Sequence, residues 1–197
     1  MGITVCLRQP LGSPDQTGIR HSARESSRKV AHDNKADVVI RPMEPDEGDA
    51  LGKVFYHAVR DGAARAYSEE QRAAWAYEAP SGPKWNARLS DQSTVVAEID
   101  RRVVGFMTLH LKTGHLDLAF ILAEAQGQGV SDALYIVLEN QARTAGLKRM
   151  TSDASHLAKP FFLRHGWRIL GSRIAERSGV TLQNWQMEKA LVAGIAT

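Results

Sequence analysis

Residues 126–131 read Gln-Gly-Gln-Gly-Val-Ser and stand between an apolar, strand-like run at 118–122 and an apolar-periodic segment at 134–142. The two glycines carry no side chain that would keep a ligand from the backbone. The first turn of a helix has N–H groups without an intrahelical partner and lies at the positive end of the helix dipole. The stretch therefore predicts phosphate binding at the start of this helix. A glycine pair is also common in tight turns that bind nothing.

Three strands are predicted before this turn, at 94–99, 103–111 and 115–122. The short connections between them predict an antiparallel meander. In the third strand, hydrophobic residues alternate with a mixed set, which predicts two opposite faces. The first face has Leu116, Leu118 and Phe120, and the second has His115, Asp117 and Ala119.

The region before the meander begins with a β-branched strand at 38–40. Apolar residues at helical spacing predict a helix at 44–60. Ser68 and Gln71 have capping-box spacing and predict a second helix that runs to about residue 77. The prolines and glycine at 80–83 are read as a break in the chain.

After the glycine turn, the pattern predicts a helix with Gly146 at its C-terminal cap, a strand at 147–152 and a short helix at 158–165. Two strands follow, at 167–173 and 181–187. The fold class is therefore mixed α/β, in the order β-α-α-β-β-β-α-β-α-β-β. A strand, a helix and a second strand at 115–152 predict a parallel pair. We expect one domain at 37–197 and a flexible tail at 1–36.

Composition excludes several classes of protein. The 197 residues carry a formal net charge of +3 from 25 basic and 22 acidic residues, a balance that makes nucleic acid an unlikely partner. No apolar run approaches the roughly 20 residues of a membrane helix. A lone cysteine, Cys6, rules out an intramolecular disulfide and is compatible with a cytoplasmic protein. The histidines lack HExxH spacing and there is no CxxC, so no metal site is predicted.

Two motifs make residues 38–191 resemble the GNAT superfamily of N-acetyltransferases. The family signature Q/R-x-x-G-x-G/A is matched by Gln126 and Gly129, with Ser131 at the last small position. Serine is small and also a good helix N-cap. The second element, N-x-x-A-x-x-F-Y-x-x-x-G-F, is similar to residues 155–167. In this chain, Ser155 occupies the position of the asparagine and Phe162 that of the tyrosine.

The resemblance implies a mostly antiparallel sheet that splays between its fourth and fifth strands, with acetyl-CoA in the gap. It implies that the pantetheine arm pairs with the backbone of Phe120, Ile121 and Leu122, and that Ser155 and Phe162 line the other wall. Backbone N–H groups of the turn would hold the pyrophosphate. The turn consists of Gln126, Gly127, Gln128, Gly129, Val130 and Ser131.

The implied reaction is direct transfer of an acetyl group from acetyl-CoA to a primary amine in a ternary complex. The amine must first lose a proton. Asp117 is the first candidate for the general base, because family members often place a carboxylate on this strand. A structurally paired carboxylate is an equally ordinary role for it. His115, His110, Glu98 and a chain of water molecules are alternatives.

The general acid has no obvious residue, because Phe162 cannot donate a proton. Ser155, His156, Tyr135 and water are the candidates, unless the thiolate leaves unassisted. A different class of function stays open as well, namely a catalytically silent module that binds acyl-CoA. The resemblance also implies a homodimer formed through the last strands, and it leaves the acceptor amine open.

Overall fold

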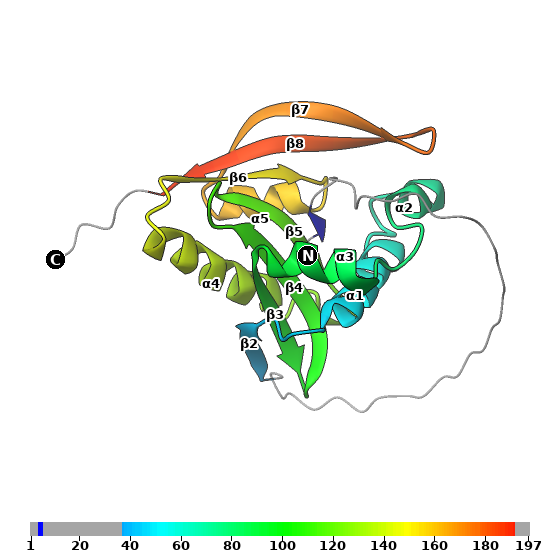
Figure 1. Ribbon diagram of the computed structural model, residues 1–197. Coiled ribbons are helices and arrows are strands. Elements are labelled where there is room, and N and C mark those ends of the chain that lie inside the picture. The colour runs from blue at the N-terminus through cyan, green and yellow to red at the C-terminus, as the bar shows by residue number, and fades with distance from the viewer. Residues whose placement is uncertain (1–3, 6–36, 192–197) are drawn as a thin grey trace.

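The computed structural model describes residues 4–5 and 37–191 (Figure 1). Apart from Thr4–Val5, the predicted tail at 1–36 lies outside the described residues, as do residues 192–197. The strands are β1 Thr4–Val5, β2 Val38–Pro42, β3 Ser93–Ile99, β4 Arg102–His110, β5 His115–Ile121, β6 Arg149–Ala154, β7 Arg168–Arg177 and β8 Val180–Ala190. The helices are α1 Gly48–Arg60, α2 Glu69–Trp75, α3 Gly82–Ser90, η1 Ala123–Ala125, α4 Val130–Thr144 and α5 Ala158–Arg164.

One mixed sheet runs through the molecule in the order β2-β3-β4-β5-β6-β8-β7, with β1 paired to β5. All of its ladders are antiparallel except that between β5 and β6. The predicted meander and the predicted parallel pair are therefore both confirmed, as is the mixed α/β class. The last two strands form a hairpin that is longer than predicted and extends along one side of the molecule (Figure 1).

Helices cover both faces of the sheet and divide the core in two. On one face, α4 and α5 pack on residues such as Met107 and Ile121. On the other face, α1, α2 and α3 pack on residues such as Phe106 and Phe120. Because both faces are covered, the central strands are buried on both sides, which explains the continuous apolar runs of β4 and β5.

A β-bulge interrupts β5. Thr108 pairs with Leu118 and Leu109 pairs with Leu116, so Asp117 is an extra residue between two ladder positions. The N–H of Leu118 donates to the hydroxyl of Thr108 at 3.0 Å, a bond that supplies the acceptor for a backbone group at the bulge.

This bulge makes the predicted alternation of β5 wrong. Leu116 packs with Ala119 in the α4–α5 cluster, whereas Leu118 and Phe120 pack with α1, α2 and α3. Asp117 contacts α3 and so lies on the side of Leu118 and Phe120, not with Ala119. An inserted residue shifts the two-residue period, and a sequence pattern that assumes an unbroken strand cannot register it.

Two helix starts illustrate how local chemistry sets the elements. At α2 the predicted capping box is confirmed, since Ser68 and Gln71 exchange side-chain to backbone bonds of 3.2 and 3.0 Å. By contrast, α3 was not predicted, because Pro83 was read as a breaker. Pro83 lies in the first turn of α3, where a missing N–H costs nothing and the fixed φ suits a helix.

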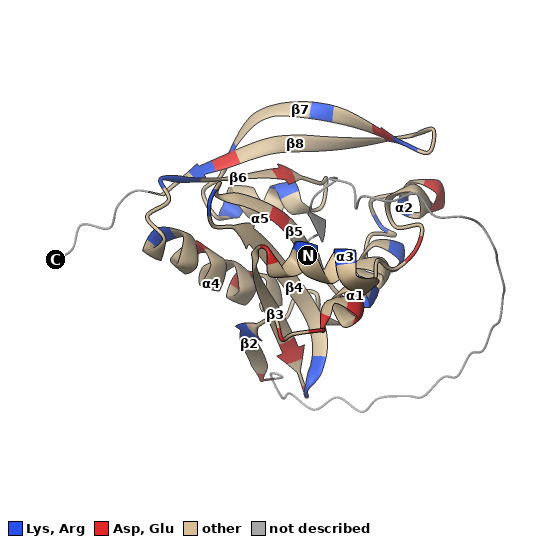
Figure 2. Ribbon diagram, viewed as in Figure 1, with Lys and Arg blue, Asp and Glu red and all other residues tan. Residues whose placement is uncertain are grey.

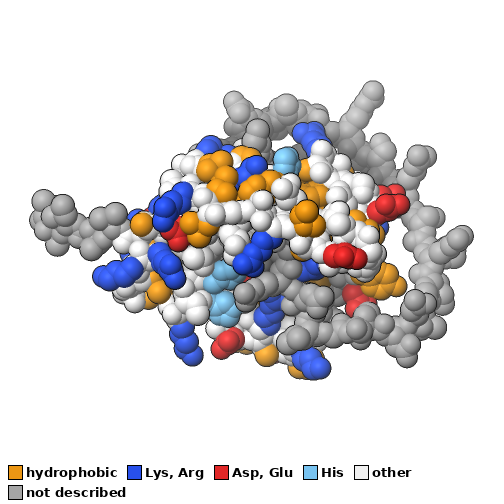
Figure 3. All heavy atoms as spheres, turned by 90° about the horizontal axis from the view of Figure 1, so that it is seen from above, with side chains coloured by type: hydrophobic (Ala, Val, Ile, Leu, Met, Phe, Trp, Pro, Cys, Tyr) orange, Lys and Arg blue, Asp and Glu red, His pale blue; other side chains and the backbone are white. Residues whose placement is uncertain are grey.

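The surface carries both signs of charge and some apolar residues. Basic and acidic residues are interspersed over the described chain (Figure 2), in line with their near balance in composition. Figure 3 looks down on the β7–β8 side and shows hydrophobic side chains exposed between basic ones. None of the helices within residues 37–191 is long and apolar enough to cross a bilayer.

Candidate functional site

The strands β5 and β6 part soon after they meet. Their parallel ladder consists of His115 and Thr151, and the Ser152 hydroxyl donates to the Leu116 carbonyl at 2.9 Å. Beyond these contacts the strands diverge, and β1 lies against β5 on that side, with Val5 opposite Ala119. We call this region, bounded by residues 118–121 and 153–156, the fork. Counted from β2, it lies between the fourth and fifth strands, where a splay was predicted.

Backbone direction decides which groups of β5 face the fork. The N–H of Leu122 donates to the Val104 carbonyl at 2.8 Å and so points to β4. Because backbone groups alternate along a strand, Phe120 also turns its N–H to β4, while Ala119 and Ile121 turn theirs to the fork. Of the three residues predicted to pair with pantetheine, Ile121 thus has the orientation for it. Ala119, which sequence reasoning missed, has it too.

The glycine turn joins the end of β5 to α4. Gly127 and Gly129 have φ of 80° and 81°, in the left-handed region where glycine is favoured. Gly129 is the N-cap of α4, so Ser131 lies in the first turn and is not the cap. A β-carbon at either glycine would meet no atom within 4 Å, which leaves open space beside the backbone.

The N–H groups of this turn differ in what they bind. The Gln126 N–H donates to the Ala123 carbonyl at 3.3 Å and is committed to the short helix η1. The first backbone bond of α4 is donated by Ala133 to Gly129 at 3.0 Å. The N–H groups of residues 130–132 precede that bond and lie at the positive end of the helix. The side chains of Gln126 and Gln128 brace the turn by donating to the carbonyls of Ile121 and Glu124.

The wall of the fork on the β6 side begins at Ser155, which is fully buried. Its hydroxyl accepts a 3.1 Å bond from the Ala158 N–H at the start of α5. Phe162 is also buried and packs on Trp167, with 4.4 Å between the ring centroids. The next residue, His156, donates its N–H to the hydroxyl of Tyr67 at 2.8 Å. Sequence reasoning missed Tyr67, which lies in the segment between α1 and α2.

Asp117 lies in the bulge and is held by α3. Its Oδ2 accepts from Arg88 at 2.8 Å and from Gln92 at 3.2 Å, and its side chain is only 5% exposed. Burial by itself raises the pKa of Asp117, but the charge and hydrogen bond of Arg88, helped by Gln92, outweigh burial and lower it. The carboxylate is therefore charged at neutral pH. Neither Arg88 nor Gln92 was singled out from the sequence.

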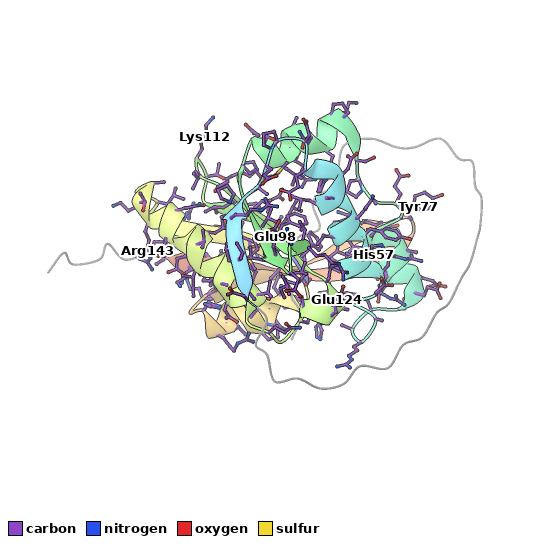
Figure 4. All side chains as sticks on the ribbon, turned by 90° about the horizontal axis from the view of Figure 1, so that it is seen from below. His57, Tyr77, Glu98, Lys112, Glu124 and Arg143 are labelled. Atoms are coloured by element: carbon purple, nitrogen blue, oxygen red, sulfur yellow. The ribbon has the colours of Figure 1, made fainter. Side chains whose placement is uncertain are left out.

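The other candidates for proton transfer are dispersed. Glu98 is paired across the sheet with Val39 of β2 and binds Arg41 at 3.0 Å, at the opposite edge of the meander from the fork (Figure 4). His115 lies at the base of the fork, where its Nδ1 is 3.2 Å from the Thr151 hydroxyl. His110 pairs with His115 at the hairpin turn.

Tyr135 belongs to the core under α4. Its hydroxyl accepts from the Trp167 indole N–H at 2.8 Å and from the Lys189 ammonium at 3.3 Å. Burial raises the pKa of Tyr135, and the neighbouring Glu139 raises it further. These contacts place Tyr135 in a structural network between α4, β8 and the segment that follows α5.

Comparisons with known proteins agree with this architecture. A family model described as an acetyltransferase (GNAT) domain matches residues 63–189. The chain is similar to an uncharacterized N-acetyltransferase of Escherichia coli strain K12, YafP, with 31% identity over 152 residues that cover 77% of this chain and 95% of YafP.

Solved structures show the same fold. A GCN5-related N-acetyltransferase from Rhodopseudomonas palustris superimposes with a TM-score of 0.73 and 31% identity, covering 82% of this chain and all of the other. A phosphinothricin acetyltransferase from Sinorhizobium meliloti, solved in complex with AcCoA, gives a TM-score of 0.62 at 21% identity, covering 81% of this chain and 91% of the other.

Proposed function

The chain belongs to the GNAT family of acetyltransferases, and from this premise we propose that it moves an acetyl group from acetyl-CoA to a primary amine by direct transfer in a ternary complex. Acetyl transfer follows from the family. The choice of a primary amine and of direct transfer is our inference.

One observation carries this proposal, the glycine turn that leads from the fork into α4. It joins a backbone edge suited to an amide-bearing arm to a 15-residue helix whose first N–H groups are positioned for phosphate oxygens. Solved relatives that contain acetyl-CoA or CoA support the same cofactor here. The pyrophosphate would lie on the N–H groups of residues 127–132.

The fork would hold the reacting thioester. The backbone of Ala119 and Ile121 would pair with the pantetheine amides, and the Ile121 N–H would stabilise the oxyanion that forms when the amine attacks. By the resemblance, Ser155 and Phe162 would form part of the opposite wall. The residues of this wall would set the position of the arm and would exclude water from the thioester.

The general base would accept the proton of the attacking amine, and Asp117 is the first candidate for this role. The role of Asp117 stays a prediction, and its surroundings limit what the residue can do. A carboxylate with a lowered pKa holds a proton weakly, so Asp117 would pass the amine's proton on to water and would not keep it. Its ion pair with Arg88 also fixes the bulge beside the fork.

A second candidate function is a catalytically silent module that binds acyl-CoA. The observation in its favour is Phe162, which stands where the family's usual tyrosine would donate a proton. Release of the CoA thiol in the presence of a panel of amines separates the two, because a silent module binds acetyl-CoA without releasing thiol.

The proposed cofactor site is tested by calorimetric titration of acetyl-CoA into wild type, Gly129→Trp and Gly146→Trp. The two glycines are matched, since both have positive φ, of 81° and 74°, and both would leave an added β-carbon in open space. Gly146 follows the far end of α4. We expect Gly129→Trp to abolish binding and Gly146→Trp to retain it. Equal losses would point to backbone strain, and no binding by wild type would contradict the proposal.

We also propose that the chain forms a homodimer through β7. This strand is at the edge of the sheet, and its Ile169, Leu170 and Ile174 are exposed, Ile174 by 73%. An exposed edge strand with apolar side chains favours pairing with another chain. A second copy would cover these residues.

A further inference from the structure

The phenol of Tyr67 is a buried polar group at the fork that the proposed mechanism leaves unused. Only 9% of the residue is exposed. Its ring meets Trp75 edge-on, with 5.3 Å between centroids and 78° between planes. Packing of this kind holds the ring in one orientation, so the hydroxyl has a fixed position.

That position joins the two walls of the fork. The phenol oxygen accepts from the His156 N–H at 2.8 Å and interacts with the Ser155 side chain, both just after the end of β6. The ring belongs to the hydrophobic cluster that contains Phe120 and Leu122 from the β5 side. Tyr67 therefore lies at the β6 wall of the fork, on the side of the sheet that carries Phe120 and Leu122.

The bond with His156 does not use the Tyr67 proton, because the phenol oxygen is the acceptor. A phenol has one donor, and its oxygen accepts from neighbouring donors. Ser155 accepts from the Ala158 N–H, and its interaction with Tyr67 is one that favours the phenolate. The His156 N–H occupies one lone pair of the phenol oxygen, and the Tyr67 O–H can turn towards a ligand in the fork.

We propose that Tyr67 is the general acid, donating its proton to the departing CoA sulfur, a role that Phe162 cannot fill. This inference rests on the proposed function. The amine nitrogen attacks the thioester carbonyl and forms the C–N bond. When the tetrahedral intermediate collapses, the C–S bond breaks and its electron pair goes to sulfur. Sulfur takes the proton of Tyr67, the amine's proton leaves to solvent, and water returns a proton to the phenolate.

The surroundings of the Tyr67 phenol favour both the donation of its proton and the phenolate that remains. Burial raises the pKa of Tyr67, while the bonds from His156 and Ser155 lower it without cancelling the effect of burial. The group is therefore protonated, and able to donate, at neutral pH. The same two donors would stabilise the phenolate once the proton has moved, because hydrogen bonds to the charged form favour it.

The proposal is tested by comparing CoA with desulfo-CoA, which lacks only the sulfur, in full-length wild type and Tyr67→Phe. Calorimetric titration needs no acceptor amine. One hydrogen bond to sulfur gives wild type a preference for CoA of about 3- to 10-fold. The preference should grow near pH ~9, where much of the thiol is ionised. Tyr67→Phe should bind the two ligands equally at both pH values. The control Tyr77→Phe, at a residue that is 72% exposed, should keep the preference.

An unchanged preference for CoA in Tyr67→Phe would overturn the assignment. If wild type bound neither CoA nor acetyl-CoA, the proposed function itself would fail, and this result is distinct from the first. In turnover with the best amine of a panel, Tyr67→Phe should lower kcat at least ~10-fold and change KM for acetyl-CoA little.

A second variant guards against a folding defect. 3-Fluorotyrosine at position 67 keeps the hydroxyl and its contacts with His156 and Ser155. Its ¹⁹F resonance should move when CoA is added and much less when desulfo-CoA is added. Equal movements would show that the hydroxyl does not contact sulfur and would overturn the proposal. The fluorinated phenol also has a lower pKa, so the fall in kcat at high pH should begin at a lower pH than in wild type.

Discussion

Arg88 on α3 and Asp117 in the bulge of β5 form an ion pair, with 2.8 Å between Nη2 and Oδ2. The pair links a helix to the central strand beside the fork. Arg88 also stacks on Trp85, 5.8 Å from the ring centroid, so its guanidinium is held from two sides. The strand irregularity that carries Asp117 is thus tied to a helix that the sequence did not predict.

We expect Arg88→Met to destabilise the fold by about 3 kcal/mol, because it takes the cation away from a buried carboxylate. Urea unfolding measures the change. The double variant Arg88→Met/Asp117→Asn should recover part of the loss, since the amide carries no charge that needs a partner. A double variant as unstable as Arg88→Met would show that packing, not charge, dominates at this site.

Glu139 on α4 should give the fold an acid-sensitive contribution. Burial raises its pKa, but hydrogen bonds with Lys189, Tyr135 and Arg143 outweigh burial and lower the pKa from 4.5 to about 2. A carboxyl with a lowered folded-state pKa stabilises the fold above its unfolded value of ~4.3, and this stability is lost as the pH falls towards 2. Glu139→Gln should therefore flatten the decline in unfolding free energy over this range.

Denaturant midpoints in a pH series measure this effect, with Glu70→Gln, at an exposed residue of α2, as the control. The unfolding free energy of the control variant should fall with decreasing pH as that of wild type does. A Glu139→Gln variant with the wild-type acid profile would contradict the prediction.

The capping box of α2 should be worth about 1 kcal/mol. Ser68→Ala removes the acceptor of the Gln71 N–H, whereas Ser81→Ala changes an N-cap of α3 whose side chain makes no capping bond. Thermal or urea unfolding should show the loss for Ser68→Ala and little change for Ser81→Ala. Equal effects of the two substitutions would argue that the hydroxyls matter through solvation alone.

The proposed dimer should depend on the exposed face of β7. Wild type should sediment as a dimer and Ile174→Lys as a monomer, because a buried ammonium in an apolar interface has no partner. Ile136→Lys, at an exposed residue of α4, should stay dimeric. A monomeric wild type would rule out the interface.

What could be predicted from sequence was local. The capping box at Ser68 and the turn around Gly129 are each set by residues within a few positions, and both were found from spacing alone. The parallel pair of β5 and β6 followed from the order of elements. The sequence did not predict α3, because a proline such as Pro83 can either end a segment or begin a helix.

The candidate site was less predictable because its contacts are not local. Arg88 meets Asp117 across 29 positions, and His156 meets Tyr67 across 89. No periodicity marks either partner. The bulge at Asp117 adds a second difficulty, since one inserted residue reverses which side chains share a face. The family motif indicated the region of the site but not the partners of its side chains.

The placement of β1 changes what a binding measurement on this protein reports. Thr4 and Val5 pair with Phe120 and Ala119, on the edge of β5 that faces the fork. A ligand that pairs with this edge enters by exchange, since it replaces hydrogen bonds already made and adds few new ones. The backbone contribution to the binding enthalpy should then be close to zero. The observed affinity then reflects the difference between two free energies, that of the ligand on this edge of β5 and that of β1 on the same edge.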